Sequence, residues 1–381
     1  MNCTLCQTNR KYPLTPAAES DKITVFQLEN RKAPELSIQK GADPLRQTAK
    51  ICAVLAVLTL LLTSCLLPEG QTPSRAASDR VVFAMDTQMS LRLYGDDGTG
   101  MKALEDLLQL LDGELSTTAE GSDLSVLNRD GSSDNAHIRA LTEGAIALSE
   151  RTGGALDVSL RPASLLWGFT TDQYRVPEPA EIEALRERVG MDGISLTETG
   201  VSLREGLSLD FGALAKGCAA DFCRERMEEA GLCGILDLGG NIQTVGDKPD
   251  GSEWNVGIQD PDDPGAFLAV LRFSGSKAVV TSGDYQRYFE QDGVRYCHIL
   301  DPETLSPVRG SLRSVTVVAK QGLLADGLAT ALFVLGREKA ADLWRNSDDF
   351  EAIFLESDGT VWITAGLEGM VSGTACQVIS R

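Results

Sequence analysis

The sequence predicts an α+β fold in which antiparallel sheets pack against helices within a single domain. Along residues 79–381, apolar residues at helical spacing alternate with short apolar-rich runs that are typical of strands. Asp292-Gly293 and Asp358-Gly359 each lie between strand-like runs, and this dipeptide is typical of tight hairpin turns. Tight turns join antiparallel neighbours, so we expect antiparallel sheets.

Four segments carry the helical pattern. The first covers about residues 100–115, where leucines recur at helical spacing. We expect further helices at 138–151, at 179–189 and at 215–230, with Gly231 as the C-cap of the last. Strands are expected where apolar residues dominate or alternate, which is the case at 81–94, 233–238, 254–259, 267–273 and 314–319.

The charge of the chain is high and unevenly distributed. The 381 residues carry a formal net charge of −20, which argues against non-specific binding to nucleic acid, because such binding requires an excess of Lys and Arg. Residues 1–64 hold eight basic and five acidic residues, whereas the remaining 317 hold 27 basic and 50 acidic residues. We therefore expect two regions with different roles to meet near residue 65.

The N-terminal region resembles an export signal. Residues 51–62 form an uncharged apolar run preceded by Arg46 and Lys50. A membrane-spanning helix needs about twenty apolar residues, so this shorter run fits the apolar core of a signal peptide. Leu62-Thr63-Ser64-Cys65 resembles a lipobox, which predicts that Cys65 is lipidated and becomes the mature N-terminus. The alternative is a buried helix that ends in a cysteine.

These features divide the chain into three parts. Residues 1–64 are interpreted as an N-terminal extension and signal peptide, in which residues 1–44 reflect an over-extended gene start. Residues 65–78 are rich in Pro, Ser and Gly and are expected to form a tether. Residues 79–381 are expected to form the catalytic domain. Localisation at the extracytoplasmic face of the cell membrane, through a lipid anchor, would follow.

Several common sites are excluded by the sequence. The chain has two histidines, so a multi-histidine metal site is ruled out. There is no Gly-x-Ser-x-Gly elbow, no Walker A sequence and no Gly-x-Gly-x-x-Gly turn after a strand. What remains is a set of glycine-punctuated polar clusters, at residues 153–169, 210–221, 237–241, 281–301 and 325–336.

Two of these clusters suit a nucleotide. Asp157 follows Gly153-Gly154, and glycines let a backbone approach a ligand whose ribose or ring a carboxylate can bind. Asp210 to Gly217 opens a helix, where backbone N–H groups and Lys216 suit a phosphate. The alternatives are an ordinary turn and strand in the first case, and an Asp N-cap with a solvated lysine in the second.

Two other clusters suit a metal ion and a base. Asp326 and Thr330 are four residues apart before an apolar run, so both oxygens face one side of a helix, and a carboxylate with a hydroxyl suits Mg²⁺. The alternative is an Asp favoured by a helix dipole. His298, beside an acidic loop that contains Asp284, can accept a proton from a hydroxyl, although a lone histidine is more often structural.

Taken in order, the clusters resemble the FAD:protein FMN transferase family of bacterial lipoproteins. The resemblance runs from Met85 to about Gly336 and includes the lipobox. Its most specific pieces are Leu166-Trp167-Gly168-Phe169, Ala215-Lys216-Gly217, Leu238-Gly239-Gly240-Asn241, Thr281-Ser282-Gly283-Asp284-Tyr285 and His298-Ile299-Leu300-Asp301-Pro302. It implies an α+β fold, and magnesium-dependent transfer of FMN from FAD to a threonine of an acceptor protein with release of AMP. It also implies acceptors that are extracytoplasmic subunits of membrane electron-transfer complexes.

The resemblance also assigns residues by motif. It implies FAD contacts near Ser116–Thr117 and at Met85, Ala155, Leu156, Asp157, Asp210, Lys216 and Leu300. It implies magnesium ligands at the backbone carbonyl of Ala213 and the side chains of Asp326 and Thr330. For the base we expect His298 or the nearby carboxylate of Asp284.

The chain departs from the family pattern at three positions. Asp86 stands where the pattern has glycine, Ser159 where it has threonine, and Cys297 where a second histidine is common. Two other functions stay open: a magnesium-dependent FAD pyrophosphatase with water as the nucleophile, and a non-catalytic, flavin-binding surface lipoprotein.

Overall fold

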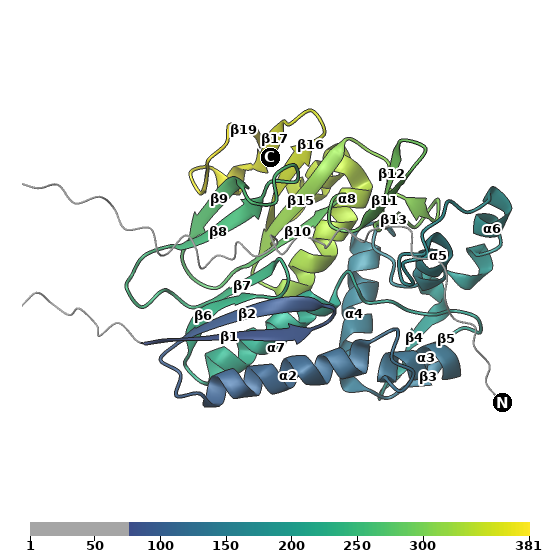
Figure 1. Cartoon of the computed structure of the whole chain (residues 1–381), viewed down its shortest axis with the longest axis horizontal. Helices are drawn as coiled ribbons and strands as arrows, with labels where there is room; N and C mark the ends of the chain where they lie inside the picture. Colours follow the sequence, from purple (N-terminus) through teal and green to yellow (C-terminus); the bar gives the residue numbers. More distant parts are fainter. Residues whose placement is uncertain (1–75) are drawn as a thin grey trace, which may run out of the picture.

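The computed structural model describes residues 76–381 as a layered α+β structure built on one nine-stranded sheet (Figure 1). The strand order is β1-β2-β6-β7-β10-β15-β16-β17-β19, and all neighbours are antiparallel except β17 and β19. In that order the strands are Ala77–Ala84, Thr87–Tyr94, Cys233–Asp237, Asn241–Val245, Ala278–Gly283, Leu312–Ala319, Phe350–Glu356, Val361–Thr364 and Cys376–Ile379.

Helices cover one face of this sheet. The long helices α7 (Ala215–Glu229) and α8 (Gly322–Arg345) pack on its central strands, while α2 (Thr99–Leu115) packs on β1 and α7, and α4 (Ala136–Arg151) packs on α8 (Figure 1). The main hydrophobic core lies between the sheet and these helices. Shorter helices are α3 (Asp123–Asp130), α5 (Arg161–Trp167), α6 (Pro179–Glu183), η3 (Arg186–Arg188), η4 (Met191–Gly193) and η5 (Ala365–Leu367).

A second, smaller sheet covers the opposite face. Its strand order is β18-β9-β8, and it encloses a separate apolar cluster with the central strands of the large sheet. Three further small sheets are β3-β5-β4, β11-β12 and β13-β14. These smaller strands are Ser132–Ser133 (β3), Ile194–Leu196 (β4), Val201–Leu203 (β5), Trp254–Gln259 (β8), Phe267–Phe273 (β9), Tyr288–Gln291 (β11), Val294–Cys297 (β12), Leu300–Asp301 (β13), Ser306–Pro307 (β14) and Val371–Ser372 (β18).

The predicted α+β class is confirmed, and most predicted elements are found near their expected bounds. Helices α2, α4 and α7 correspond to the patterns at 100–115, 138–151 and 215–230. Strands β6, β8, β9 and β15 correspond to four of the five predicted runs. Both Asp-Gly dipeptides lie in hairpin connections, between β11 and β12 and between β16 and β17.

The prediction of one strand over 81–94 is wrong. The segment is a hairpin, in which β1 turns back into β2 at Met85-Asp86. Both turn residues have positive φ, 50° and 57°, as a tight two-residue hairpin turn requires. The sequence hides the turn because apolar residues run up to Met85 and neither turn residue is glycine or asparagine. Strand β1 begins at Ala77, two residues before the expected domain boundary at 79.

Two helix ends also differ from expectation. The single helix expected at 179–189 is the short helix α6 followed by the 3₁₀ turn η3. Helix α7 ends with Ala230 as its C-cap, and Gly231 follows it with a φ of 65°. The Gly231 and Leu232 amides donate to the carbonyls of Glu228 and Met227, which is a Schellman motif. The glycine that ends the helix is thus Gly231, as predicted, and only the C-cap itself lies one residue earlier, at Ala230.

No helix within residues 76–381 is long and apolar enough to cross a membrane. The predicted signal peptide, lipobox and most of the tether lie outside the described residues.

Candidate active site

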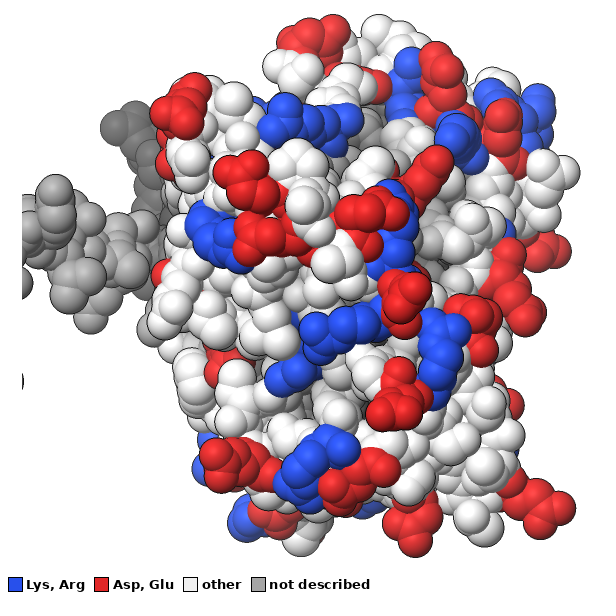
Figure 2. Space-filling model, turned by 90° about the vertical axis from the view of Figure 1, so that its right-hand side faces the viewer, with Lys and Arg blue, Asp and Glu red and all other residues white. Residues whose placement is uncertain are grey.

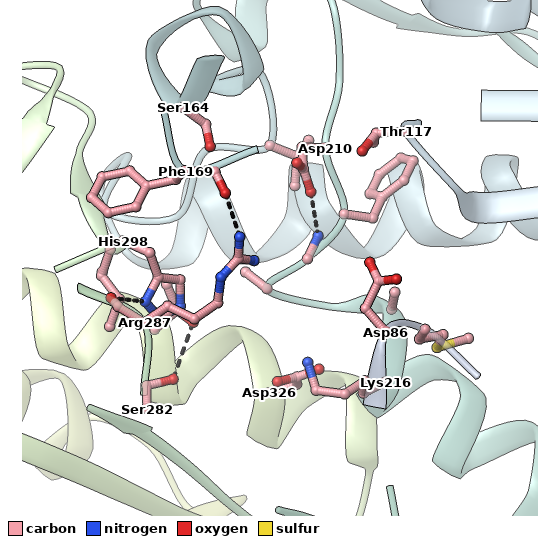
Figure 3. A pocket seen from close by; sticks show the side chains of 18 of the residues that line it. Asp86, Thr117, Ser164, Phe169, Asp210, Lys216, Ser282, Arg287, His298 and Asp326 are labelled. Carbon is pink, nitrogen blue, oxygen red and sulfur yellow. Dashed lines mark hydrogen bonds between the residues drawn. The ribbon is translucent and has the colours of Figure 1, made fainter. Parts of the chain in front are cut away.

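One cavity of about 390 Å³ gathers His298 and the residues predicted to bind FAD and magnesium (Figure 3). Its walls come from the β1–β2 turn, the end of α2, the loop before α5, the starts of α5 and α7, strand β10 and the first turns of α8. All residues that the family resemblance assigns to FAD or magnesium line it: Met85, Ser116, Thr117, Ala155, Leu156, Asp157, Asp210, Ala213, Lys216, Leu300, Asp326 and Thr330. Segments more than 200 residues apart in sequence thus meet at one site.

The β1–β2 turn forms one wall. The Met85 amide donates to Oδ1 of Asp112 at 2.7 Å, which ties the turn to the end of α2. Asp86 is exposed at the cavity and has a φ of 57°, a conformation that glycine adopts at less cost. This explains why the family pattern has glycine there, and it adds a carboxylate to the wall that the pattern lacks.

The loop that carries Asp157 is held by a short hydrogen-bond chain. Asp157 Oδ1 accepts from the amide of Ser159 at 2.7 Å and from its hydroxyl at 2.6 Å. The Ser159 oxygen in turn accepts from the Gly190 amide at 2.6 Å. Burial raises the pKa of Asp157, opposed by the two bonds from Ser159. Serine thus supplies the hydroxyl that the threonine of the family pattern would supply.

The first turn of α7 faces the cavity. Asp210 Oδ1 accepts from the Gly212 amide at 2.7 Å, which shapes the loop before the helix. Lys216 is half-buried in the first turn and lines the cavity beside Asp326 (Figure 3). A lysine and the positive end of a helix dipole both favour a negative charge, so this corner suits a phosphate. The Ala215 and Gly217 amides of this turn already donate to the Phe211 carbonyl and to Asp326.

Helices α7 and α8 begin against one another because of two glycines. A Cβ added at Gly217 would collide with the Gly322 carbonyl oxygen, and one added at Gly322 would collide with the Gly217 oxygen. The close crossing is held from both sides. Asp221 on α7 accepts from the amides of Gly322 and Leu323 at 2.9 Å each, and Asp326 on α8 accepts from the Gly217 amide at 2.8 Å.

Asp326 is therefore a buried carboxylate beside the start of α7. Its side chain lies against the amide of a different helix, so the dipole it meets is that of α7 and not that of its own helix. Burial raises the pKa of Asp326 to about 6, and the positive charge of Lys216 and the Gly217 N–H oppose the rise. A carboxylate with this pKa is ionised at neutral pH and stays available to a cation.

The oxygen donors near Asp326 suit magnesium. Thr330 lies one helical turn further along α8, and its hydroxyl is 3.2 Å from the Ser282 hydroxyl on β10. No group of three or more His, Cys, Asp or Glu side chains able to hold a metal ion occurs within residues 76–381. A cation here would rely on one carboxylate, a hydroxyl, the Ala213 carbonyl and substrate phosphates, which is the set that Mg²⁺ accepts. The residues present therefore fit the ion.

His298 is poised as a proton acceptor. Its Nδ1 lies 3.2 Å from the backbone oxygen of Arg287 (Figure 3). A carbonyl oxygen can only accept, so Nδ1 carries the hydrogen and Nε2 keeps a lone pair. Burial, and secondarily the charges of Arg287 and Lys216, lower the pKa of His298 to about 4. The ring is thus neutral at pH 7 and keeps its Nε2 lone pair, although the same lowered pKa makes it a weaker base than a free imidazole.

Asp284 is not part of this arrangement, and its assignment as a base is corrected. It does not line the cavity. Its carboxylate binds Nε of Arg313 at 3.1 Å, and the same arginine contacts Asp262 at 3.1 Å. Strand β10 ends at Gly283, and Asp284 follows it. The Asp284 amide donates a hydrogen bond to the Arg313 carbonyl of β15. The nearness of Asp284 to His298 in sequence therefore did not show where the Asp284 side chain points.

Sequence reasoning also missed cavity residues. The clearest are Asp112, Arg161, Asn241 and Arg287. The guanidinium of Arg287 donates to the Phe169 carbonyl, while its backbone oxygen orients His298. Arg161, Asn241 and Arg287 lie within predicted polar clusters, so a search for every polar residue of those clusters would have found them.

The surface charge is mixed on the face that Figure 2 shows. Lys and Arg side chains there are interspersed with Asp and Glu and do not form one basic field. This face therefore lacks the continuous positive surface that non-specific nucleic-acid binding uses.

Comparison with known proteins gives one consistent result. Residues 85–354 match the model of the ApbE family. The chain is 36% identical over 290 residues to an FAD:protein FMN transferase of Treponema pallidum, covering 70% of this chain and 80% of that protein. A relative of the same name from Vibrio cholerae is 33% identical, covering 74% and 86%.

Solved structures agree with the sequence matches. The ApbE protein of Thermotoga maritima superposes with a TM-score of 0.72 at 28% identity, covering 77% of this chain and 99% of that one. The flavinyl transferase ApbE of Pseudomonas stutzeri gives 0.71 at 30% identity, covering 80% and 100%. The chain belongs to the ApbE family.

Proposed function

We propose that this protein transfers FMN from FAD to a threonine hydroxyl of an acceptor protein, with release of AMP and with magnesium as cofactor. One observation carries the proposal: a single cavity brings together Lys216, the Asp326–Thr330 pair and a neutral histidine. The names of the relatives, FAD:protein FMN transferase, support the same reaction.

The chemistry is a phosphoryl-type displacement. The acceptor oxygen attacks the phosphorus of the FMN half of FAD, a new P–O bond forms, and the bond to the AMP oxygen breaks. AMP leaves with the electron pair, and Nε2 of His298 takes the hydroxyl proton. Lys216 and the first turn of α7 neutralise the diphosphate, because such reactions depend mainly on positioning and charge. Magnesium, held by Asp326, Thr330 and the Ala213 carbonyl, would supply further charge neutralisation.

The direct test uses a candidate acceptor protein from the same host. After incubation with FAD and magnesium, mass spectrometry is expected to show FMN covalently bound to a threonine of the acceptor. An acceptor that stays unmodified would contradict the proposal.

Lys216 is expected to serve FAD and not the fold. Lys216→Ala should weaken FAD binding about tenfold or more, because a charged contact to phosphate is lost. The melting temperature of the ligand-free protein should change little, since the side chain is half-buried at the cavity wall. Lys320→Ala, at an exposed position outside the cavity, is the matched control. A large loss of ligand-free stability in Lys216→Ala alone would support the structural interpretation.

We also propose a lipid anchor at Cys65, at the extracytoplasmic face of the cell membrane, where acceptor subunits of electron-transfer complexes would be reached. The apolar run, the lipobox-like sequence and the following tether support this. Protein isolated from host membranes should begin at Cys65 with a lipid-sized mass increment. Membrane-associated protein that still carries residues 1–64 would refute the anchor.

A further inference from the structure

Asn241 is the first residue of β7, and its side chain lines the cavity while being only 1% exposed. Neither its Nδ2 nor its Oδ1 has a hydrogen-bond partner within the protein. Among the side chains of residues 76–381, it is the one whose amide nitrogen and oxygen are both buried and unpartnered. Buried polar groups are nearly always paired, and each one left unpaired costs its full desolvation energy. This position therefore calls for an explanation beyond folding.

The backbone holds this amide firmly in place. The preceding turn uses Gly239 and Gly240, with φ of 72° and 88°, and Leu238 donates its amide to the Asn241 carbonyl at 2.9 Å. Asn241 then pairs with Val280 of β10 in the large sheet. The unpartnered amide is thus built into a rigid strand and is not the result of a mobile loop.

The direction of the side chain follows from the alternation of the strand. Val245, four residues further along β7, belongs to the core beneath the helices, so Asn241 and Gln243 face the same way. That direction leads to the starts of α7 and α8, where Asp326 lies. The Asn241 amide is close enough to lower the pKa of Asp326, but its geometry does not complete a hydrogen bond.

We propose that Asn241 is a binding residue for the diphosphate of FAD and its divalent cation. The Nδ2 group donates to a phosphate oxygen, and Oδ1 faces the cation or a water molecule bound to it. An amide is suited to this position because a phosphate offers only acceptors and a hydrated cation offers only a positive charge or donors. The assignment rests on the proposed function, because it takes FAD as the ligand.

The test compares two alanine variants on the same face of β7. Asn241→Ala should bind FAD at least about tenfold more weakly in magnesium buffer, as loss of a hydrogen bond to a charged group predicts. Its ligand-free melting temperature should stay the same or rise, because an unsatisfied polar group is removed. Gln243→Ala is the control. Gln243 is fully buried and outside the cavity, and its Nε2 donates to the Thr244 carbonyl at 2.8 Å. It should lose stability and keep its FAD affinity.

FAD affinity is measured from the quenching of flavin fluorescence, and stability from thermal unfolding without ligand. Asn241→Asp, which has the same shape, should also bind FAD weakly, because it adds a negative charge beside the diphosphate. If Asn241→Ala binds FAD as tightly as the wild type does, the assignment is overturned. It is also overturned if both Asn241 variants lose ligand-free stability and keep FAD affinity, as a structural role requires. Wild-type protein that binds no FAD would instead defeat the proposed function itself.

Discussion

Asp326→Asn is expected to lose most FMN transfer while the protein stays folded. The amide oxygen can still accept from the Gly217 N–H, which Asp326 binds at 2.8 Å, so the crossing of α7 and α8 keeps its bond. What is lost is the one buried carboxylate of the proposed magnesium site, and metal assistance of this kind is worth several kcal/mol. We expect the transfer rate to fall about a hundredfold or more at low magnesium.

Asp326→Ala extends the same test. It should show a similar loss, with partial rescue at high magnesium because Thr330 and the phosphates still offer oxygens. It should also be less stable than Asp326→Asn, because the Gly217 amide is left without an acceptor. Transfer at the wild-type rate by either variant in low magnesium would refute the metal assignment.

The pH dependence of the wild type follows from the same carboxylate. Burial raises the pKa of Asp326 from 3.8 to about 6, so the group binds a proton more readily in the folded than in the unfolded state. In the ligand-free protein, the contribution of Asp326 to the free energy of unfolding is therefore lost as the pH rises from about 4 to about 6. Magnesium-dependent FAD binding has the opposite trend and should weaken as the pH falls through about 6. Asp326→Asn should lose the part of each trend that comes from this carboxylate, while Asp157, whose pKa is also raised by burial, keeps its own contribution.

His298→Gln is expected to lower transfer by about 10²- to 10⁴-fold, the range of general base catalysis. FAD affinity should be nearly unchanged, because the role assigned to the ring is to take a proton. The pKa of His298, lowered to about 4, keeps the ring neutral above pH 5, so the weakening of wild-type FAD binding near pH 6 should belong to Asp326. Single-turnover rates at saturating FAD separate the two effects. A His298→Gln variant with wild-type single-turnover rates would remove the base assignment.

Local sequence patterns predicted those site residues whose positions depend on a single helix. Asp326 and Thr330 share a face of α8 by helical spacing, and Lys216 lies in the first turn of α7, as their neighbours in sequence indicated. The assignment of Asp284 as a base was wrong because the direction of a side chain at the end of a strand depends on the neighbouring strand. Here Arg313 of β15 binds the Asp284 carboxylate and holds it outside the cavity. Such partners are distant in sequence.

The unpredicted features depend on the assembled fold. The role of Arg287 requires the hairpin of β11 and β12 to place its carbonyl against His298. The unpartnered amide of Asn241 exists only once β7 pairs with β10 beneath α7 and α8. The hairpin at Met85-Asp86 was missed because Asp86 adopts the positive φ that the family pattern gives to glycine.

The most direct test of the proposed reaction follows both products of FAD at once. The protein, FAD, magnesium and a candidate acceptor are incubated together; AMP is quantified and the acceptor is mapped by mass spectrometry. The transfer mechanism predicts FMN bound to one threonine of the acceptor, in an amount equal to the AMP released, and no reaction after chelation of magnesium. Free FMN and AMP with an unmodified acceptor would show hydrolysis by water, and intact bound FAD without AMP would show a flavin carrier; either result contradicts FMN transfer.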